Sequence, residues 1–371
     1  MPMHRRAFLT TLTAAGLAAP ALASPRSILR VSLLGQALIE HAPTDREWPG
    51  RRAVAAQLAR AEAVFTNLET VIKGPNAGAP TRELLTLHAA EPEVLDALKS
   101  VHVNLLATAN NHAFDLGAGG IVDTVSAILQ AGLASAGSGE TLDMASSPAQ
   151  VLSRSGATAV VAFATGKIRP GGAATPDHAG VNELRRDPSG QPLVEDVTRI
   201  LNAIAVARRS ANVVLAYQHN HDWEPEQADV PAWQRDLARR CIDAGASAFV
   251  GHGVPLLQGI EFHNRAPIFY GLGNFIFQTE KPVGAYPPES WEGVIVDCQF
   301  VEGRFSQASL IPLALNEVGL GGPDDLATRG FPQLAGRAQS AAILRRIEER
   351  SRAFGAPLGL TGSAAGRLRP R

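Results

Sequence analysis

Cysteine, methionine and tyrosine are scarce in this sequence, which has 2, 3 and 3 of them among 371 residues. Two cysteines exclude a framework of several disulfides and permit at most one bridge. Cys241 falls in a helix-like stretch, and Cys298 falls in a strand-like stretch that alternates apolar and polar residues. We therefore expect both to be small, unpaired side chains of the core.

The sequence also lacks an excess of charge of one sign, and it lacks long apolar runs beyond its N-terminus. It has 34 basic and 35 acidic residues, without a long run of either. This balance gives no basic stripe of the kind that binds nucleic acid or an anionic membrane. After the N-terminal segment, no apolar stretch reaches the roughly 20 residues of a membrane-spanning helix. We therefore expect no nucleic-acid partner and no membrane span in the mature chain.

What is present at the N-terminus is the pattern of an export signal. Arg5 and Arg6 are followed by Phe8, Leu9 and a mildly apolar run to about residue 23. This is typical of a twin-arginine signal peptide, and residues 21–23 offer the small residues of a cleavage site. We expect residues 1–23 to be removed and the mature protein to be periplasmic or otherwise extracytoplasmic. The alternative is an uncleaved anchor or an N-terminal amphipathic helix.

The rest of the chain alternates between strand-like and helix-like stretches. Strands are expected at 29–34, 63–67, 84–87, 103–108, 160–164, 212–217 and 248–250, and helices at 51–63, 91–100, 119–131, 194–210 and 231–244. From 259 to 312 the pattern alternates in steps of two, which is typical of antiparallel strands. The order indicates an α/β protein with at least one mixed sheet. One more helix is expected at 336–353, followed by a loose tail.

Polar side chains follow five of these strands, where ligand sites form in α/β folds. They include carboxylates, amides and imidazoles, which suit Mn, Zn or Fe. In chain order they are Gln36, Asn67 with Glu69, Asn110 and Asn111 with His112 and Asp115, His219 with His221, and His252. Each alone fits a helix cap, a solvated side chain or a satisfied loop histidine. Their joint placement predicts one metal-capable site.

Four segments give the sequence a resemblance to a known family. They are Asn67-Leu-Glu69, Ala109-Asn-Asn-His-Ala-Phe-Asp115, Gly251-His252 with Leu257-Gln-Gly-Ile-Glu261, and Pro267-Ile-Phe-Tyr-Gly-Leu-Gly-Asn-Phe-Ile-Phe277. With them, residues 29 to about 315 resemble the bacterial CapA family of capsule and poly-γ-glutamate synthesis. The resemblance implies a calcineurin-like metallophosphoesterase-type fold, a four-layer αββα sandwich with mixed sheets. This domain would occupy residues 24–317, and residues 318–371 would be a C-terminal extension.

The resemblance also implies roles for residues at the strand ends. In sites of this kind a carboxylate bridges two metal ions, and Glu69 matches that place. An asparagine and two histidines complete one metal position, and Asn111, His219 and His252 match them. These four residues are the metal ligands that the resemblance predicts.

Beside the metal position, the resemblance implies residues that act on the substrate. His112 matches a histidine that contacts the substrate, and Asp115 would orient its ring. His221 lies two residues after His219, on the same face of an extended segment, and would add a base or a further ligand. The other residues expected to contact the substrate are Gln36, Asn67 and Asn110.

The family's other metal position does not carry over to this chain. The family has Gly-Asp at the first strand end, where this chain has Gly35-Gln36. The family has Gly-His-x-Pro-His after the late strand, where this chain has Gly251-His-Gly-Val-Pro255. Glutamine lacks the charge of aspartate, and proline has no side-chain ligand. The sequence therefore predicts a site for one divalent ion (Mn, Zn or Fe), or a site without metal.

Three functions are open at this point. The first is a metallophosphoesterase-like hydrolase acting on a phosphoester or an anionic polymer such as poly-γ-glutamate, alongside capsule or polymer synthase subunits. The second is a non-catalytic accessory subunit that binds the polymer. The third is a metal-independent acid–base enzyme, such as a peptide or polymer epimerase. The loop 166–180, with Lys167 and Arg169, either approaches a polyanion or is a mobile surface loop.

Overall fold

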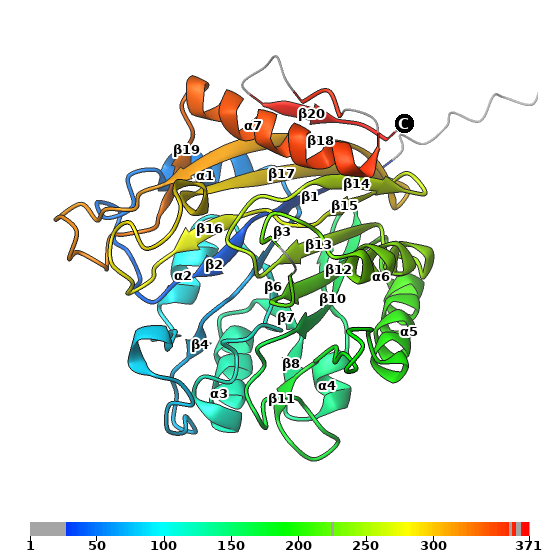
Figure 1. The fold of residues 1–371 in the computed structure, drawn as a ribbon, viewed down its shortest axis with the longest axis horizontal. Coiled ribbons are helices and arrows are strands. Elements are labelled where there is room, and N and C mark those ends of the chain that lie inside the picture. The colour runs from blue at the N-terminus through cyan, green and yellow to red at the C-terminus, as the bar shows by residue number, and fades with distance from the viewer. Residues whose placement is uncertain (1–26, 224–225, 356–357, 361–364, 371) are drawn as a thin grey trace, which may run out of the picture.

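The computed structural model describes residues 27–223, 226–355, 358–360 and 365–370 (Figure 1). The expected signal peptide, residues 1–23, lies outside this range. The α-helices are α1 (Arg51–Leu58), α2 (Val94–Lys99), α3 (Gly117–Gln130), α4 (Leu142–Ser146), α5 (Val194–Ser210), α6 (Ala232–Asp243) and α7 (Arg337–Ser351). Among the described residues, no helix combines the length and apolar character needed to cross a membrane.

The larger sheet is mixed and contains the first strand of the chain. Its strands lie in the order β19 (Pro332–Leu334), β18 (Arg304–Leu315), β17 (Glu292–Val301), β1 (Ile28–Leu33), β3 (Ala63–Asn67), β6 (Leu105–Ala107) and β7 (Ala134–Ala136), and β20 (Gly366–Leu368) also pairs with β18. From β1 to β7 the neighbours are parallel, whereas β17 and β18 are antiparallel. The stretch that alternates in steps of two thus supplies the antiparallel half.

The smaller sheet is also mixed. Its order is β14 (Ile260–His263), β15 (Ala266–Phe269), β13 (Ala248–His252), β12 (Val213–Asn220), β10 (Gly156–Thr165) and β9 (Ala149–Ser153). The four central strands are parallel, and both edge strands are antiparallel. Short two-stranded pairs join β2 (Gln36–Leu38) with β16 (Asn274–Phe277), β4 (Val71–Ile72) with β5 (Ala89–Ala90), and β8 (Ser138–Gly139) with β11 (Gly180–Val181).

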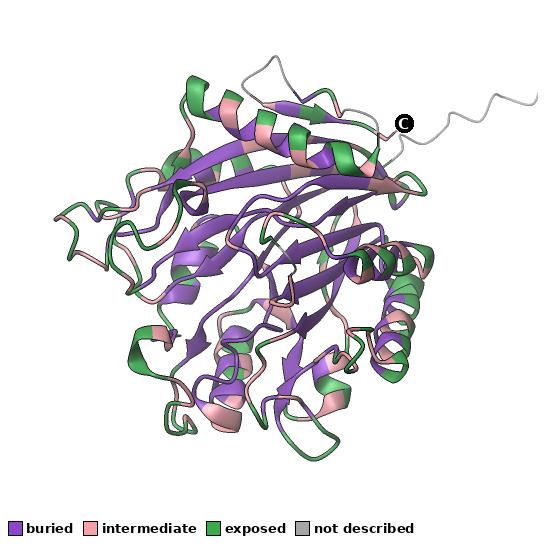
Figure 2. Ribbon diagram, viewed as in Figure 1, coloured by how far each residue is buried: buried purple, intermediate pink, exposed green. Residues whose placement is uncertain are grey.

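The two sheets pack face to face around one buried core, which appears as continuous buried strands in Figure 2. Leu33 and Phe65 of the larger sheet share this core with Leu215 and Val250 of the smaller sheet. Side chains alternate between the two faces of a strand, so each sheet has a second apolar face to cover.

Helices cover these outer faces. Val54 of α1 and Val94 of α2 pack with Val64 on the outside of the larger sheet. Ile200 of α5 and Leu237 of α6 pack on the outside of the smaller sheet, and Figure 1 shows these two helices side by side. The predicted four-layer αββα arrangement is therefore confirmed.

Three local expectations differ from the structure. Residues 84–86 form a 3₁₀ helix, not a strand, because Leu84 and Leu85 lie at the surface without a partner strand. Helix α1 ends at Leu58, because the chain must turn before β3 begins. Within the tail expected to be loose, β20 forms on β18 and buries Leu368 in the inner core.

The two cysteines and the last helix complete the core. Cys241 and Cys298 are both buried and unpaired. Helix α7 places Ile343, Leu344 and Ile347 in the inner core, beside residues of both sheets. It lies along β18 in Figure 1. A segment after residue 317 therefore helps to close the space between the two sheets.

Candidate active site

The carboxyl ends of the parallel strands carry most of the polar residues expected from the sequence. Cα of His219, at the end of β12, pairs with Cα of His252, at the end of β13. Glu69 follows β3, and Asn111 and His112 follow β6. A cavity of about 270 Å³ lies here. Its polar and proline lining comprises Gln36, Glu69, Arg82, Thr86, His88, Asn111, His112, Lys167, His221, Gln227, Pro255, Thr279 and Lys281.

Glu69, His219 and His221 form a group that could share one ion. One ligand atom from each lies within 4.8 Å of the others. The Oε1 of Glu69 is 3.4 Å from Nε2 of His219, and Oδ1 of Asn111 is 2.8 Å from the same nitrogen. These separations match neighbouring ligands on one ion, whose bonds are about 2.0–2.2 Å long. The structure thus brings together three of the predicted ligands and adds His221 to them.

The buried polar atoms of this group fit a divalent ion. Oε2 of Glu69 and both ring nitrogens of His221 are buried without a hydrogen-bond partner among the described residues, although such atoms are usually paired. Burial, the largest cause, lowers the pKa values of His219 and His221 well below the usual histidine value, so both imidazoles are neutral. Neutral imidazole and carboxylate are suitable ligands for Mn, Zn or Fe.

His252 and Gln36 are held by the backbone. Nε2 of His252 donates to the carbonyl oxygen of Leu34 at 3.0 Å, while its Nδ1 is buried without a partner. Burial lowers the pKa of His252 to about 3. His252 lies outside the group of three. The side-chain oxygen of Gln36, at the place where the resemblance implies a metal-binding aspartate, accepts the backbone N–H of Gly253 at 3.0 Å.

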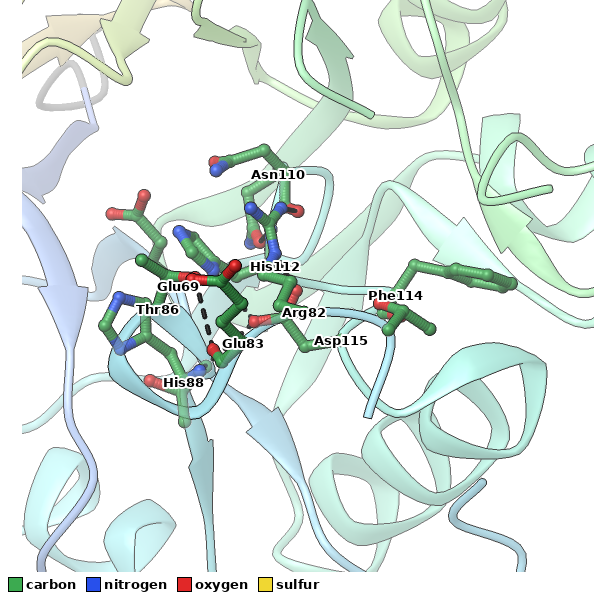
Figure 3. A network of polar contacts seen from close by, with 12 residues as sticks. Glu69, Arg82, Glu83, Thr86, His88, Asn110, His112, Phe114 and Asp115 are labelled. Atoms are coloured by element: carbon green, nitrogen blue, oxygen red, sulfur yellow. Dashed lines mark hydrogen bonds and ion pairs between the residues drawn. The ribbon is translucent and has the colours of Figure 1, made fainter. Parts of the chain in front are cut away.

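His112 and Asp115 form the expected dyad. Nδ1 of His112 lies 2.9 Å from Oδ2 of Asp115, and the fully buried Asp115 also pairs with Arg82 (Figure 3). Arg82 donates in addition to the backbone carbonyl of Asn111. Burial, and then the nearby charge of His88, lowers the pKa of His112 well below its usual value. A neutral ring held at Nδ1 leaves Nε2 for the cavity.

Asn67 and Asn110 brace the strand ends and are not among the cavity-lining residues. Nδ2 of Asn110 donates to Oδ1 of Asn67 at 3.1 Å and to the carbonyl of Leu68 at 2.7 Å. Oδ1 of Asn110 accepts the backbone N–H of His112 at 3.0 Å. This pair therefore fixes the turn that presents the dyad.

Several cavity residues lie outside the sequence expectations, and three of them have basic side chains: Arg82, His88 and Lys281. They lie in loops or before a short strand, so a search of strand ends has no signal for them. The segment that carries Arg82 is held beside the cavity because the backbone N–H of the preceding residue, Thr81, donates to the carbonyl of Asp115 at 2.9 Å. The loop from residue 166 does approach the cavity, since Lys167 lines it and lies 5.0 Å above the ring of Trp223.

Sequence comparisons with known proteins agree with the resemblance. The family model described as bacterial capsule synthesis protein PGA_cap matches residues 32–279. Uncharacterized protein y4uA of Sinorhizobium fredii is 28% identical over 419 residues, covering 87% of this chain and 89% of that protein. PGA biosynthesis protein CapA of Bacillus subtilis is 33% identical over 186 residues, covering 50% and 45%. A solved phosphatase from Mycoplasma pneumoniae is similar with a TM-score of 0.46 and 12% identity, covering 78% and 95%.

Proposed function

Because the chain belongs to the bacterial capsule synthesis protein family PGA_cap, we propose that it is an exported hydrolase of capsule or poly-γ-glutamate-type polymer biosynthesis or processing. Its substrate is an anionic polymer or a phosphoester, and it works with subunits of a polymer synthase. The observation that supports hydrolysis is the group Glu69, His219 and His221, with ligand atoms within 4.8 Å, beside His112 in one cavity.

The ligand group would hold one divalent ion. Glu69, His219 and His221 supply a carboxylate and two neutral imidazoles, and the Asn111 oxygen lies beside them. A bound divalent ion supplies Lewis acidity, which polarises a substrate oxygen. Gln36 and Pro255 leave the family's second position without its usual ligands.

The other residues of the cavity position the substrate and move protons. Arg82, Lys167 and Lys281 place three cationic side chains on the lining, which suits phosphate or carboxylate groups. His112, held at Nδ1 by Asp115, presents Nε2 for proton transfer with the leaving group. Asp115 is held in turn by Arg82, so the ring orientation is fixed before the substrate arrives.

A second candidate is a non-catalytic accessory subunit that binds the polymer. The observation that favours it is the hydrogen bond that the backbone N–H of Gly253 donates to the side-chain oxygen of Gln36, at a place where the resemblance implies a metal ligand. The cationic lining is unaffected by this change and would still bind a polyanion. Binding without cleavage would then be the whole function of the cavity.

Metal content and hydrolysis separate these functions. The chain without residues 1–23 is loaded with Mn²⁺ or Zn²⁺, and bound metal is counted by elemental analysis. Hydrolysis is followed on bis(p-nitrophenyl) phosphate and on poly-γ-glutamate. We expect one equivalent of metal, with metal and activity both lost in Glu69→Gln and His219→Ala but kept in the surface control His263→Ala.

Other results of these two measurements would identify a different function. Polymer binding without cleavage by the metal-loaded protein would identify the accessory subunit. Hydrolysis or epimerisation that survives chelation would identify a metal-independent acid–base enzyme. A wild-type chain that binds no metal under loading would rule out the proposed hydrolase.

A further inference from the structure

A second histidine–carboxylate pair lies on the wall of the same cavity. Nδ1 of His88 pairs with Oε1 of Glu40, and His88 lines the cavity together with His112. The two imidazole rings meet edge to face, with centroids 4.3 Å apart. In each ring Nδ1 is held by a carboxylate, and neither Nε2 has a hydrogen bond within the described part of the chain. Both Nε2 atoms are therefore available to a ligand.

The backbone of His88 is fixed from two sides. Its N–H donates to Oδ2 of Asp115 at 3.1 Å, the same oxygen that holds His112, and its carbonyl accepts from Val71 at 3.0 Å. Its partner Glu40 is fixed as well, because the side-chain oxygen of Gln278 accepts the backbone N–H of Glu40 at 2.8 Å. The pair is thus built into the fold and is not a chance surface contact.

The two carboxylates differ in how their charge is balanced. Asp115 is paired with the guanidinium of Arg82, so its charge is already neutralised beside His112. Glu40 has His88 as its ion-pair partner. Each ring is thus oriented by its own carboxylate at Nδ1, and the two rings contact each other on the cavity wall.

We propose that His88 is a substrate-contacting residue, whose Nε2 makes a hydrogen bond with an anionic group in the cavity, beside Nε2 of His112. Arg82 completes the anion subsite from the same wall. The anionic group is a phosphate or a carboxylate, since both accept charge-assisted hydrogen bonds from a guanidinium group. This inference rests on the proposed function only in taking the cavity as the substrate site.

The test is a titration of the metal-free full-length chain with two probes, inorganic phosphate and a γ-linked glutamate oligomer. Ring nitrogens are observed by long-range ¹H–¹⁵N NMR, and affinity is measured by calorimetry. We expect the ring-nitrogen signals of His88 to move when a probe binds. His88→Gln is expected to weaken binding about tenfold or more. The probe that binds more tightly identifies the phosphate or the carboxylate source.

His263 offers a matched control, because it forms a histidine–carboxylate pair with Asp243 at 2.8 Å outside the cavity lining. His263→Gln should bind both probes like the wild type. Glu40→Gln keeps the His88 ring but removes the carboxylate that holds its Nδ1, so the affinity for both probes should fall. This second variant decides the question if His88→Gln does not fold.

Two results would overturn the assignment: a His88→Gln protein that is folded and binds both probes as the wild type does, or a wild-type chain that binds neither. The proposed hydrolase is judged separately, because His88→Gln leaves Glu69, His219 and His221 in place. It should therefore retain one equivalent of metal. Loss of anion binding with metal retained is the combined expectation.

Discussion

The side-chain oxygen of Gln36 accepts the backbone N–H of Gly253 at 3.0 Å, which joins the end of the first strand to the loop after β13. The resemblance to the family implies a carboxylate and a histidine on one metal position at these two places. In this chain the amide oxygen is already engaged by the backbone, and Pro255 adds no ligand. A hydrogen bond within the chain thus lies where the resemblance implies a metal ligand.

Restoring the two ligands should restore the second metal. We expect Gln36→Asp combined with Pro255→His to raise bound Zn²⁺ or Mn²⁺ from one to two equivalents by elemental analysis. Gln36→Asp alone should remain at one, because a single new carboxylate without the histidine gives an incomplete ligand set. Two equivalents in the unaltered chain would contradict the assignment of one lost position.

His221 and His252 should differ in their effect on metal affinity. His221 belongs to the group within 4.8 Å and has both ring nitrogens unpaired, whereas His252 donates to Leu34 and lies outside that group. We expect His221→Ala to weaken metal binding by roughly tenfold or more, and His252→Ala to weaken it less. Competition with a chromophoric chelator measures both. A larger loss for His252→Ala would restore the ligand set implied by the family.

The sequence predicts the architecture and the strand-end residues well, for a physical reason. Apolar runs with helical or alternating spacing report burial directly, and α5 begins and ends at the residues expected. Polar residues after parallel strands must meet at one edge of a sheet. Glu69, Asn111 and His219 therefore come together as expected.

The rest of the site depends on loops, whose paths cannot be predicted from the spacing of apolar residues. Arg82 and His88 reach the cavity because Asp115 accepts hydrogen bonds from both. The choice between His221 and His252 as third ligand depends on the direction of each ring, which strand register alone leaves open. The sequence places Leu368 in a loose tail. The three-residue strand β20 is stabilised by pairing with the distant strand β18, and a local sequence pattern does not show that contact.

Leu368 provides a stability test of that last contact. Its side chain is fully buried in the inner core. Leu368→Ala should lower the free energy of unfolding by about 2–5 kcal/mol, as for other buried leucines. Urea denaturation followed by circular dichroism measures the change. Leu320→Ala, at a side chain that is 58% exposed, should change it by less than about 0.5 kcal/mol.

Export should depend on the paired arginines. The twin-arginine pattern at Arg5 and Arg6 predicts that lysine at both positions blocks transport. Cell fractionation of a tagged chain should show the wild type outside the cytoplasm and the Arg5→Lys, Arg6→Lys protein inside it. Equal extracytoplasmic amounts of both proteins would contradict this route, and a retained N-terminus on the exported form would indicate an uncleaved anchor.

Glu69 should make the stability of the metal-free protein depend on pH. Burial raises its pKa from 4.5 to about 8, and the nearby Arg82 only partly opposes this. Since the folded pKa lies above the unfolded one, the protonated carboxyl stabilises the fold below about pH 4.5, and this contribution is lost as the pH rises through 8. Over this interval the wild type should lose on the order of a few kcal/mol relative to Glu69→Gln. Urea denaturation at pH 5, 6.5 and 8 measures the difference, with exposed Glu93→Gln as the control.

Saturating Zn²⁺ should reverse the trend, because the ion binds the carboxylate form of Glu69 and releases its proton. A difference between wild type and Glu69→Gln that stays constant with pH would show that Glu69 is ionised throughout.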